Sequence, residues 1–247
     1  MLNQDLIDSF AHQANIAYRA VYNTFERSAL AEGAALTPVR TDCFVVEAKV
    51  GRTVEVVGAL KVEQLSRRHR ANSKSAPVSD RIAVLMASKD IYAFDDALST
   101  GKASYLQEAF VDIGYYKVSR KGWRALLGVR YDFAGRGARE GHPIFHAQMH
   151  DGSAGRSLAA LPTVPTIQPL PESEVFDQVR LPTANMIGAS ALLKLSADHL
   201  SHDSFKTVLQ QMRGQTFFGN WRCNCSTLDD VDSARGLLAT GWYAGKA

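Results

Sequence analysis

The first 32 residues carry hydrophobic side chains at the spacing of an α-helix. Positions three or four apart are held by Leu6, Phe10, Ala14, Ala17, Val21, Phe25 and Ser28. This spacing places them on one face and predicts a single amphipathic helix over residues 4–32. Asn3 or Asp5 can cap its start, and Gly33 follows its end, where a left-handed residue commonly stops a helix. Such a helix spans roughly 42 Å, so it either lies across a sheet, which we favour, or packs partly against a second copy in a homodimer.

From Thr41 the hydrophobic period changes from helical to two. Phe44, Val46, Ala48 and Val50 alternate with more polar neighbours, and the alternation resumes at Val54, Val56 and Leu60. This pattern predicts a hairpin of half-buried strands. A three-residue loop over 51–53 would place Val50 opposite Val54 and would pair Lys49 with Glu55 on the outer face.

Further strand-like segments follow a polar, basic stretch at 66–79 that has no hydrophobic rhythm and is predicted to be a loop. The predicted strands cover residues 82–87, 91–94, 105–116, 123–133 and 142–150. Short connections between them favour antiparallel neighbours.

Residues 162–182 hold five of the eight prolines, which indicates an extended surface connection. The helical period then returns over 186–200, 204–213 and 226–240. This order predicts an α+β fold: an antiparallel sheet meander with a long N-terminal helix and a C-terminal helical group. We expect residues 1–160 to form the helix and sheet, 161–182 the crossing and 183–247 the helical group, all on one core.

Composition narrows the function classes. The chain is 46% hydrophobic and 21% charged, enough apolar surface for a folded core. It contains no run of about 18 apolar residues, so no membrane span is expected, and its acidic N-terminus is unlike a signal peptide. Cys223 and Cys225 have only one residue between them, whereas structural zinc pairs usually have two to four. We therefore expect a cytoplasmic protein with reduced thiols, no metal and no cofactor.

The most informative segment for chemistry is the predicted strand over 142–150. In a strand, His142, His146 and His150 face one side while Phe145 and Ala147 face the core. If the preceding strand matches its apolar side, Arg130 and Asp132 join the histidines. Such a patch could exchange protons near neutral pH or bind phosphate. The alternative is an ordinary polar face that is solvated or covered by a helix.

If this face is catalytic, each residue type has a natural role. His146 is central and is the candidate general base, with His142 and His150 on either side. Arg130 could stabilise a phosphate or oxyanion, and Asp132 could orient an imidazole.

The segment His146-Ala147-Gln148-Met149-His150 resembles the alternating-histidine strand of the histidine-triad nucleotide hydrolases and transferases. That resemblance implies phosphoryl-transfer or hydrolytic chemistry. Gln148 stands at the position of the family's nucleophilic histidine, and an amide cannot attack phosphorus as imidazole does.

A broader resemblance is to an uncharacterised prokaryotic family with three sequence features. These are a Tyr-Asp strand, a His-Pro-x-x-His strand and an Arg-(Ile/Leu)-Pro segment, here Tyr131-Asp132, His142-Pro143 with His146, and Arg180-Leu181-Pro182. The resemblance implies a prokaryotic origin and brings no known activity.

Glu47-Ala48-Lys49 matches half of the restriction-like nuclease motif, in which a carboxylate holds Mg²⁺. The further acidic residue that the motif needs on a neighbouring upstream strand is missing, since residues 4–32 are predicted to be helical. An ion pair between Lys49 and Glu55 explains the same residues without chemistry.

Two basic stretches suggest a different partner. The first contains Arg67, Arg68 and Arg70, and the second contains Lys117, Arg120 and Lys121 beside Tyr115, Tyr116 and Trp123. Basic residues interleaved with aromatic ones suit single-stranded nucleic acid. The net charge of +3 adds no strong global field. We therefore favour a binding or interaction module with nucleic acid as the candidate partner. The alternative is a phosphoryl-transfer or hydrolytic enzyme that uses the histidine face.

Overall fold

The computed structural model describes residues 4–38, 42–49, 52–66, 81–94, 104–133, 145–153, 166–171, 180–183, 186–219 and 222–223. Its elements, in chain order, are α1 (Gln4–Ala31), β1 (Ala35–Pro38), β2 (Phe44–Lys49), β3 (Thr53–Ser66), β4 (Arg81–Phe94), β5 (Ser104–Ser119), β6 (Gly122–Phe133), β7 (Phe145–His150), β8 (Ile167–Gln168), β9 (Arg180–Pro182), α2 (Gly188–His199), α3 (His202–Arg213), the 3-10 helix η4 (Thr216–Gly219) and β10 (Arg222–Cys223). The α+β prediction, with a long N-terminal helix and C-terminal helices, is confirmed.

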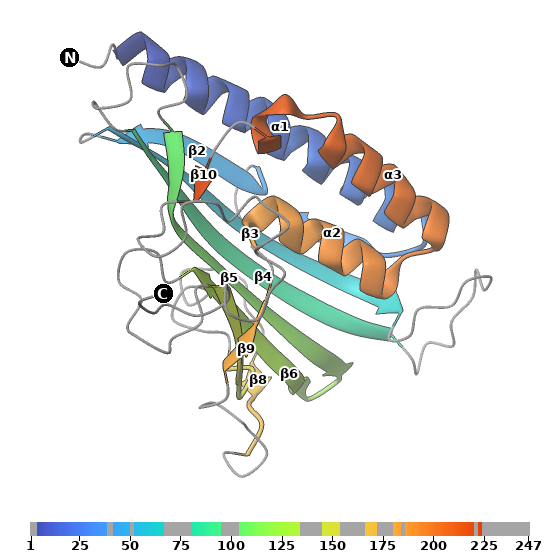
Figure 1. Ribbon diagram of the computed structural model, residues 1–247. Helices are drawn as coiled ribbons and strands as arrows, with labels where there is room; N and C mark the ends of the chain where they lie inside the picture. The colour runs from blue at the N-terminus through green and yellow to red at the C-terminus, as the bar shows by residue number, and fades with distance from the viewer. Residues whose placement is uncertain are drawn as a thin grey trace.

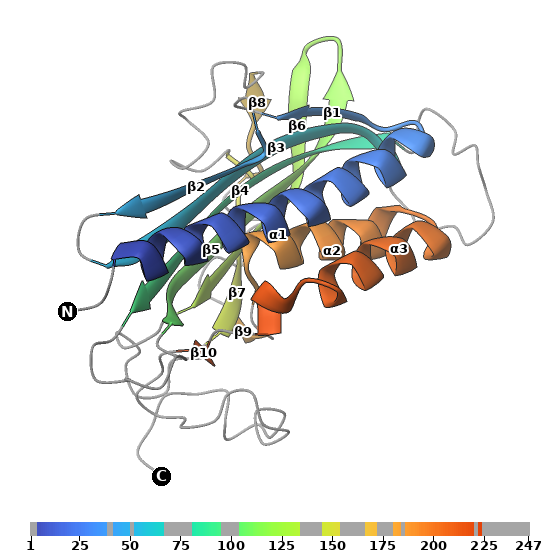
Figure 2. The ribbon, with the colours of Figure 1, turned by 90° about the horizontal axis from the view of Figure 1, so that it is seen from above.

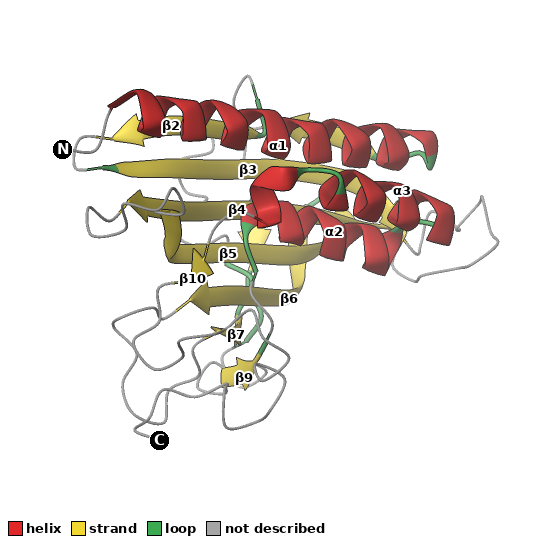
Figure 3. Ribbon diagram, turned by 45° about the horizontal axis from the view of Figure 1, so that its top comes forward, coloured by secondary structure: helices red, strands yellow, loops and turns green. Residues whose placement is uncertain are grey.

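The strands form one sheet with the order β1-β3-β4-β5-β6-β7-β9, and every neighbouring pair along this path is antiparallel. β2 pairs with the start of β3. Two short pairings, β8 with β6 and β10 with β5, are parallel and were not expected. The helices lie on one side of the sheet (Figure 1). They cover its β2–β4 half, and β6, β7 and β9 extend beyond them (Figure 3).

α1 lies along the sheet beside α2 and α3, as the favoured prediction requires (Figure 2). Its buried face includes Ala14, Ala17, Val21 and Phe25 as expected. The first turn differs: Ile7 is buried and Leu6 is 59% exposed, because a period alone does not choose between adjacent residues at the edge of an apolar stripe. The homodimer through this helix stays a prediction.

The end of α1 follows the predicted glycine stop. Gly33 has a φ of +85°, and the amide of Ala34 donates to the carbonyl of Ala29. This 6→1 hydrogen bond closes the helix in the way that a left-handed glycine allows.

The β2–β3 hairpin is confirmed, but the predicted register is wrong by two positions. Lys49 lies opposite Thr53, and Phe44 lies opposite Gly58. A Cβ at residue 58 would overlap the Phe44 ring, so this register needs a glycine there. Lys49 and Glu55 are not directly opposite each other, but the expected ion pair still forms across the diagonal, with Lys49 Nζ 3.6 Å from a carboxylate oxygen of Glu55.

The predicted runs 82–87 and 91–94 form one strand, β4, rather than two. The polar residues that separate them include Asp90, which is fully buried beneath α1 and α2. Its carboxylate accepts hydrogen bonds from the Tyr18 hydroxyl and the Gly188 amide. The polar interruption in the hydrophobic pattern therefore marks a helix contact and not a turn.

The helices predicted at 186–200 and 204–213 are confirmed as α2 and α3 within two residues at each end, whereas 226–240 lies outside the described residues. The parts of the proline-rich segment that the structure describes join the sheet as β8 and β9. On the face opposite the helices, Ile167 and Leu170 pack on a small second core that contains Tyr116 and Trp123. No helix in the described part of the chain is long and apolar enough to cross a membrane.

Candidate functional site

The predicted arrangement of the histidine strand against its neighbour is confirmed. Tyr131 pairs with Ala147 and Phe133 with Phe145, and these four belong to the main core, on the helix side of the sheet. Asp132 pairs with His146 on the opposite face. An odd register would have turned the histidine toward the helices.

On that opposite face, the predicted polar residues bind mainly to one another. Arg130 Nε donates to Asp132 Oδ2 at 2.7 Å, and its guanidinium donates to Gln148 at 3.3 Å. His146 Nε2 lies 3.6 Å from Asp132 Oδ2. The His146 side chain is only 4% exposed, so the predicted central base is the least accessible described member of the set.

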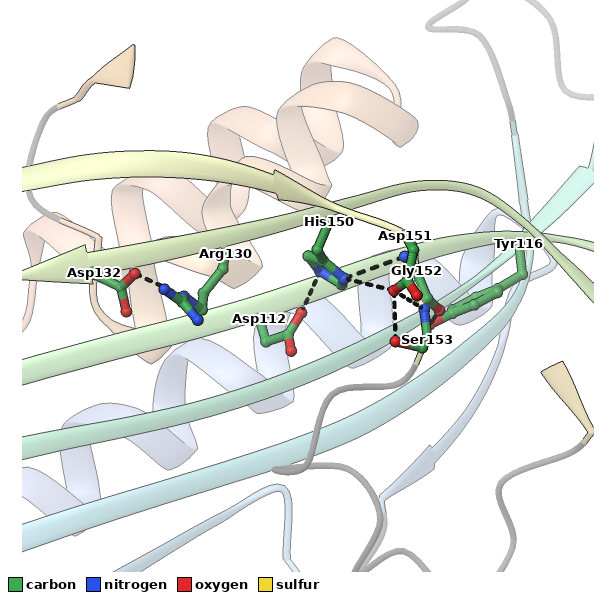
Figure 4. A network of polar contacts seen from close by, with 8 residues as sticks. All are labelled: Asp112, Tyr116, Arg130, Asp132, His150, Asp151, Gly152 and Ser153. Carbon is green, nitrogen blue, oxygen red and sulfur yellow. Dashed lines mark hydrogen bonds and ion pairs between the residues drawn. The ribbon is translucent and has the colours of Figure 1, made fainter. Parts of the chain in front are cut away.

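His150 forms a second group with Asp112, a β5 residue that sequence reasoning missed (Figure 4). His150 Nε2 lies 2.9 Å from Asp112 Oδ1, and the Gly152 amide donates to His150 Nδ1 at 3.2 Å. The imidazole lies over Gly128, where an added Cβ would overlap the ring. Nδ1 therefore holds the turn that follows β7, whereas Nε2 lies at ion-pair distance from Asp112 on β5 without a hydrogen bond between the two.

The same turn is fixed further by two neighbours. The Tyr116 hydroxyl donates to the Gly152 carbonyl at 3.0 Å, and the Asp151 carboxylate accepts from the Ser153 amide at 2.8 Å. The network in Figure 4 thus contains three carboxylates, those of Asp112, Asp132 and Asp151, and one guanidinium, that of Arg130. This balance disfavours a phosphate, which needs clustered positive charge. Among the described residues there is no group of three possible metal ligands.

The candidate nucleic-acid residues are only partly described. Lys117, Arg120 and Lys121 are exposed at the β5–β6 hairpin. The neighbouring rings of Tyr116 and Trp123 are 0% and 4% exposed, so they belong to the core and cannot stack on bases. The other predicted nucleic-acid residues, Arg67, Arg68 and Arg70, lie outside the described residues, as does His142 of the predicted histidine face.

On the helix side of the sheet, β6, β7 and β9 extend past α2 (Figure 3). Side chains from these strands and from α2 line a cleft. Its volume is about 870 Å³. The strands contribute apolar side chains, among them Leu126, Leu127, Val129, Ala147, Met149 and Leu181. The α2 wall is formed by Lys194, Ala197, Asp198 and His199.

His199 is the most distinctive polar residue of the cleft. Its Nδ1 lies 2.8 Å from the Ser66 carbonyl oxygen, which can only accept. Nδ1 therefore carries the hydrogen, and in the neutral ring Nε2 presents a lone pair. Burial lowers the pKa of His199, which favours that neutral ring. Within the described part of the chain, Nε2 has no hydrogen-bond partner.

Two further buried polar atoms of the cleft residues share this property. The hydroxyls of Tyr115 and Thr183 also have no partner among the described residues. Burial raises the pKa of Tyr115, so its hydroxyl stays protonated and can donate. The Tyr115 and His199 rings are neighbours, with centroids 5.6 Å apart. Beside them, Lys194 and Asp198 pair one helical turn apart.

The charges of this cluster also act on Tyr131. Burial raises the pKa of the Tyr131 phenol, while nearby Lys194 lowers it and Asp198 raises it. The cleft thus combines an apolar floor with phenol, imidazole and one internally neutralised ion pair.

Comparison with known protein families, characterised proteins and solved structures finds no match to this chain. The two resemblances drawn from sequence therefore stay predictions, and the site rests on geometry alone. One sequence signal could have pointed to His199. It follows Leu192, Leu195 and Ser196 at helical spacing, on the face that α2 buries, and histidine is an uncommon choice for such a face.

Proposed function

We propose that the protein binds a small, largely apolar molecule in the cleft between α2 and strands β5–β7. The observation that carries this proposal is the apolar cleft bordered by three buried polar atoms that lack partners among the described residues. A buried polar atom without a partner costs about 1–3 kcal/mol. Each such atom needs an explanation, and in an apolar cleft a ligand that supplies the missing hydrogen bond gives one.

The dimensions support the same function. Ligand pockets usually measure about 300–1,000 Å³ and combine apolar walls with a few polar groups. This cleft, at about 870 Å³, has that size and that composition. Its apolar floor would supply affinity through burial, and the polar atoms would supply orientation.

The functions predicted from sequence have weaker support. The histidine face is occupied by its own hydrogen bonds and ion pairs, and its carboxylates would repel a phosphate. The basic hairpin keeps its positive charge, but its aromatic neighbours are buried. A binding module remains the favoured class, with a small molecule in place of nucleic acid as the ligand.

The test uses N-phenyl-1-naphthylamine, an uncharged dye whose fluorescence rises in apolar surroundings. Ala197 lines the cleft and is exposed, so Ala197→Phe should fill the cleft without disturbing the core. We expect saturable dye binding that this variant weakens by about tenfold or more. Ala48→Phe, at an exposed position on β2 outside the cleft, is the matched control and should bind like the wild type. Equal dye affinity of the wild type and Ala197→Phe would contradict the proposal.

A further inference from the structure

The polar atoms of the cleft also indicate which chemical group its ligand carries. His199 is held as a hydrogen-bond acceptor, because its Nδ1 hydrogen is committed to the Ser66 carbonyl and burial disfavours a second proton. A ligand atom that meets Nε2 must therefore be a donor, either O–H or N–H.

Tyr115 offers the complementary function. Its hydroxyl is a donor without a partner among the described residues, and its ring lies next to the His199 ring. One ligand group that both donates and accepts could satisfy the two side chains together. A hydroxyl group does so with a single oxygen.

The charges nearby argue against an ionised group. Lys194 is already paired with Asp198 one turn away, so the α2 wall offers no uncompensated charge to a carboxylate or an ammonium. A carboxylate would also face the Nε2 lone pair and the Asp198 charge. Taking an ion out of water without a partner is costly, whereas an uncharged hydroxyl that finds both hydrogen bonds avoids that cost.

We infer that the ligand is an apolar molecule bearing one uncharged hydroxyl, an alcohol or a phenol, which donates to His199 Nε2 and accepts from the Tyr115 hydroxyl. This inference rests on the proposed function of the cleft. Both protein atoms are shielded from water, so binding requires a small outward shift of the surrounding side chains. The hydrogen bonds then form where water does not compete.

The experiment compares three compounds with the same apolar body, each displacing the dye at pH 8. They are 4-hexylphenol, hexylbenzene and 4-hexylbenzoate, which differ only in the polar end. The phenol should bind about tenfold more tightly than the other two, since one satisfied hydrogen bond is worth about that factor. Equal affinity of the phenol and the hydrocarbon, or tighter binding of the benzoate, would overturn the hydroxyl inference while leaving the cleft as a binding site.

Two variants test the named atoms. His199→Asn places an amide nitrogen where Nδ1 donates to Ser66 and removes the Nε2 acceptor, so it should abolish the phenol preference while the hydrocarbon still binds. Tyr115→Phe removes only a hydroxyl and should reduce the same preference even if the His199→Asn variant does not fold. His202→Asn, at an exposed position on α3, is the control and should retain it. A full preference in the folded His199→Asn and Tyr115→Phe variants would refute the assigned roles, and absence of dye binding to the wild type would refute the cleft itself.

Discussion

The pH dependence of stability should be dominated by Asp90, a carboxyl group in the middle of β4. Asp90 is 0% exposed, and its Oδ2 accepts from the Tyr18 hydroxyl at 2.8 Å and the Gly188 amide at 2.9 Å. Burial raises the pKa of Asp90 from 3.8 to about 7, although both hydrogen bonds oppose the rise. Tyr18, which donates to Asp90, and Tyr92, which is hydrogen-bonded to Tyr18, are phenols, and burial raises the pKa of Tyr18 well above its usual value.

The sign and size of the effect follow from this shift. The folded protein holds the Asp90 proton more tightly than the unfolded chain, so its stabilising contribution is complete below pH 3.8 and is lost as the pH rises to about 7. At about 1.4 kcal/mol per pKa unit, a shift of about three units costs about 4 kcal/mol of unfolding free energy. An uncharged residue at this position would be free of that loss.

Asp90→Asn removes the ionisation and keeps an oxygen that can accept both hydrogen bonds. Urea unfolding at pH 5, 6, 7 and 8 should show the variant gaining stability on the wild type as the pH rises, by about 3 kcal/mol across this range. Tyr18→Phe is a control with the opposite expected effect. It removes one hydrogen-bond donor to the Asp90 carboxylate, so the free energy of unfolding should fall more steeply above pH 6 than in the wild type. A difference between the Asp90→Asn variant and the wild type that is constant with pH would refute the reasoning.

Three further predictions test other parts of the molecule. Tyr115→Phe should leave the free energy of unfolding unchanged or raise it, whereas Tyr116→Phe should lower it by about 1 kcal/mol, because only the Tyr116 hydroxyl has a described partner. Urea unfolding of both variants measures this, and equal destabilisation would contradict it. Gly128→Ala should displace the His150 ring and lower the free energy of unfolding by about 1–3 kcal/mol, while Gly219→Ala, whose added Cβ meets no described residue within 4 Å, should not. An unchanged stability of the Gly128→Ala variant would show that the His150 ring can move freely. Alanine at the three exposed basic residues of the β5–β6 hairpin should weaken any binding of single-stranded RNA, measured by fluorescence anisotropy at low salt, and no binding by the wild type would remove the nucleic-acid hypothesis.

The sequence pattern predicted the sheet faces well because alternation is a strict geometric constraint. In the β6–β7 pair, a slip by one residue would bring His146 to the helix side, so the hydrophobic pattern alone selected the correct faces. A slip by two residues leaves every face unchanged, and this is the error made in the β2–β3 hairpin. The observed register depends on Gly58 lying beneath the Phe44 ring, a contact between strands that no single-strand pattern contains.

The roles of Asp90 in the core and of His199 in the cleft could not be derived from the hydrophobic pattern. In the sequence, Asp90 interrupts the hydrophobic pattern and so predicts a break between two strands. Its hydrogen-bond partners come from α1 and α2, which the strand pattern does not contain. The pattern around His199 predicts only an amphipathic helix. Its tautomer depends on the Ser66 carbonyl, 133 positions away in the chain. Both depend on long-range packing, which sequence periodicity does not report.

The two faces of the sheet also show why residue type is a weak guide to a site. The face opposite the helices carries the histidines, the arginine and the aspartates that chemistry favours, yet Arg130, Asp132 and His150 are bound to one another or to the adjacent turn. A substrate there would have to break interactions that already stabilise the fold. In the cleft, Tyr115 and His199 lack such partners within the described residues, so a ligand would add hydrogen bonds without breaking any at those atoms. The histidine face also holds buried atoms without a hydrogen-bond partner among the described residues, His150 Nε2 and Asp112 Oδ1, but these two already lie 2.9 Å apart as an ion pair. A ligand at Tyr115 and His199 would compete with no such pair, so binding there should gain more free energy.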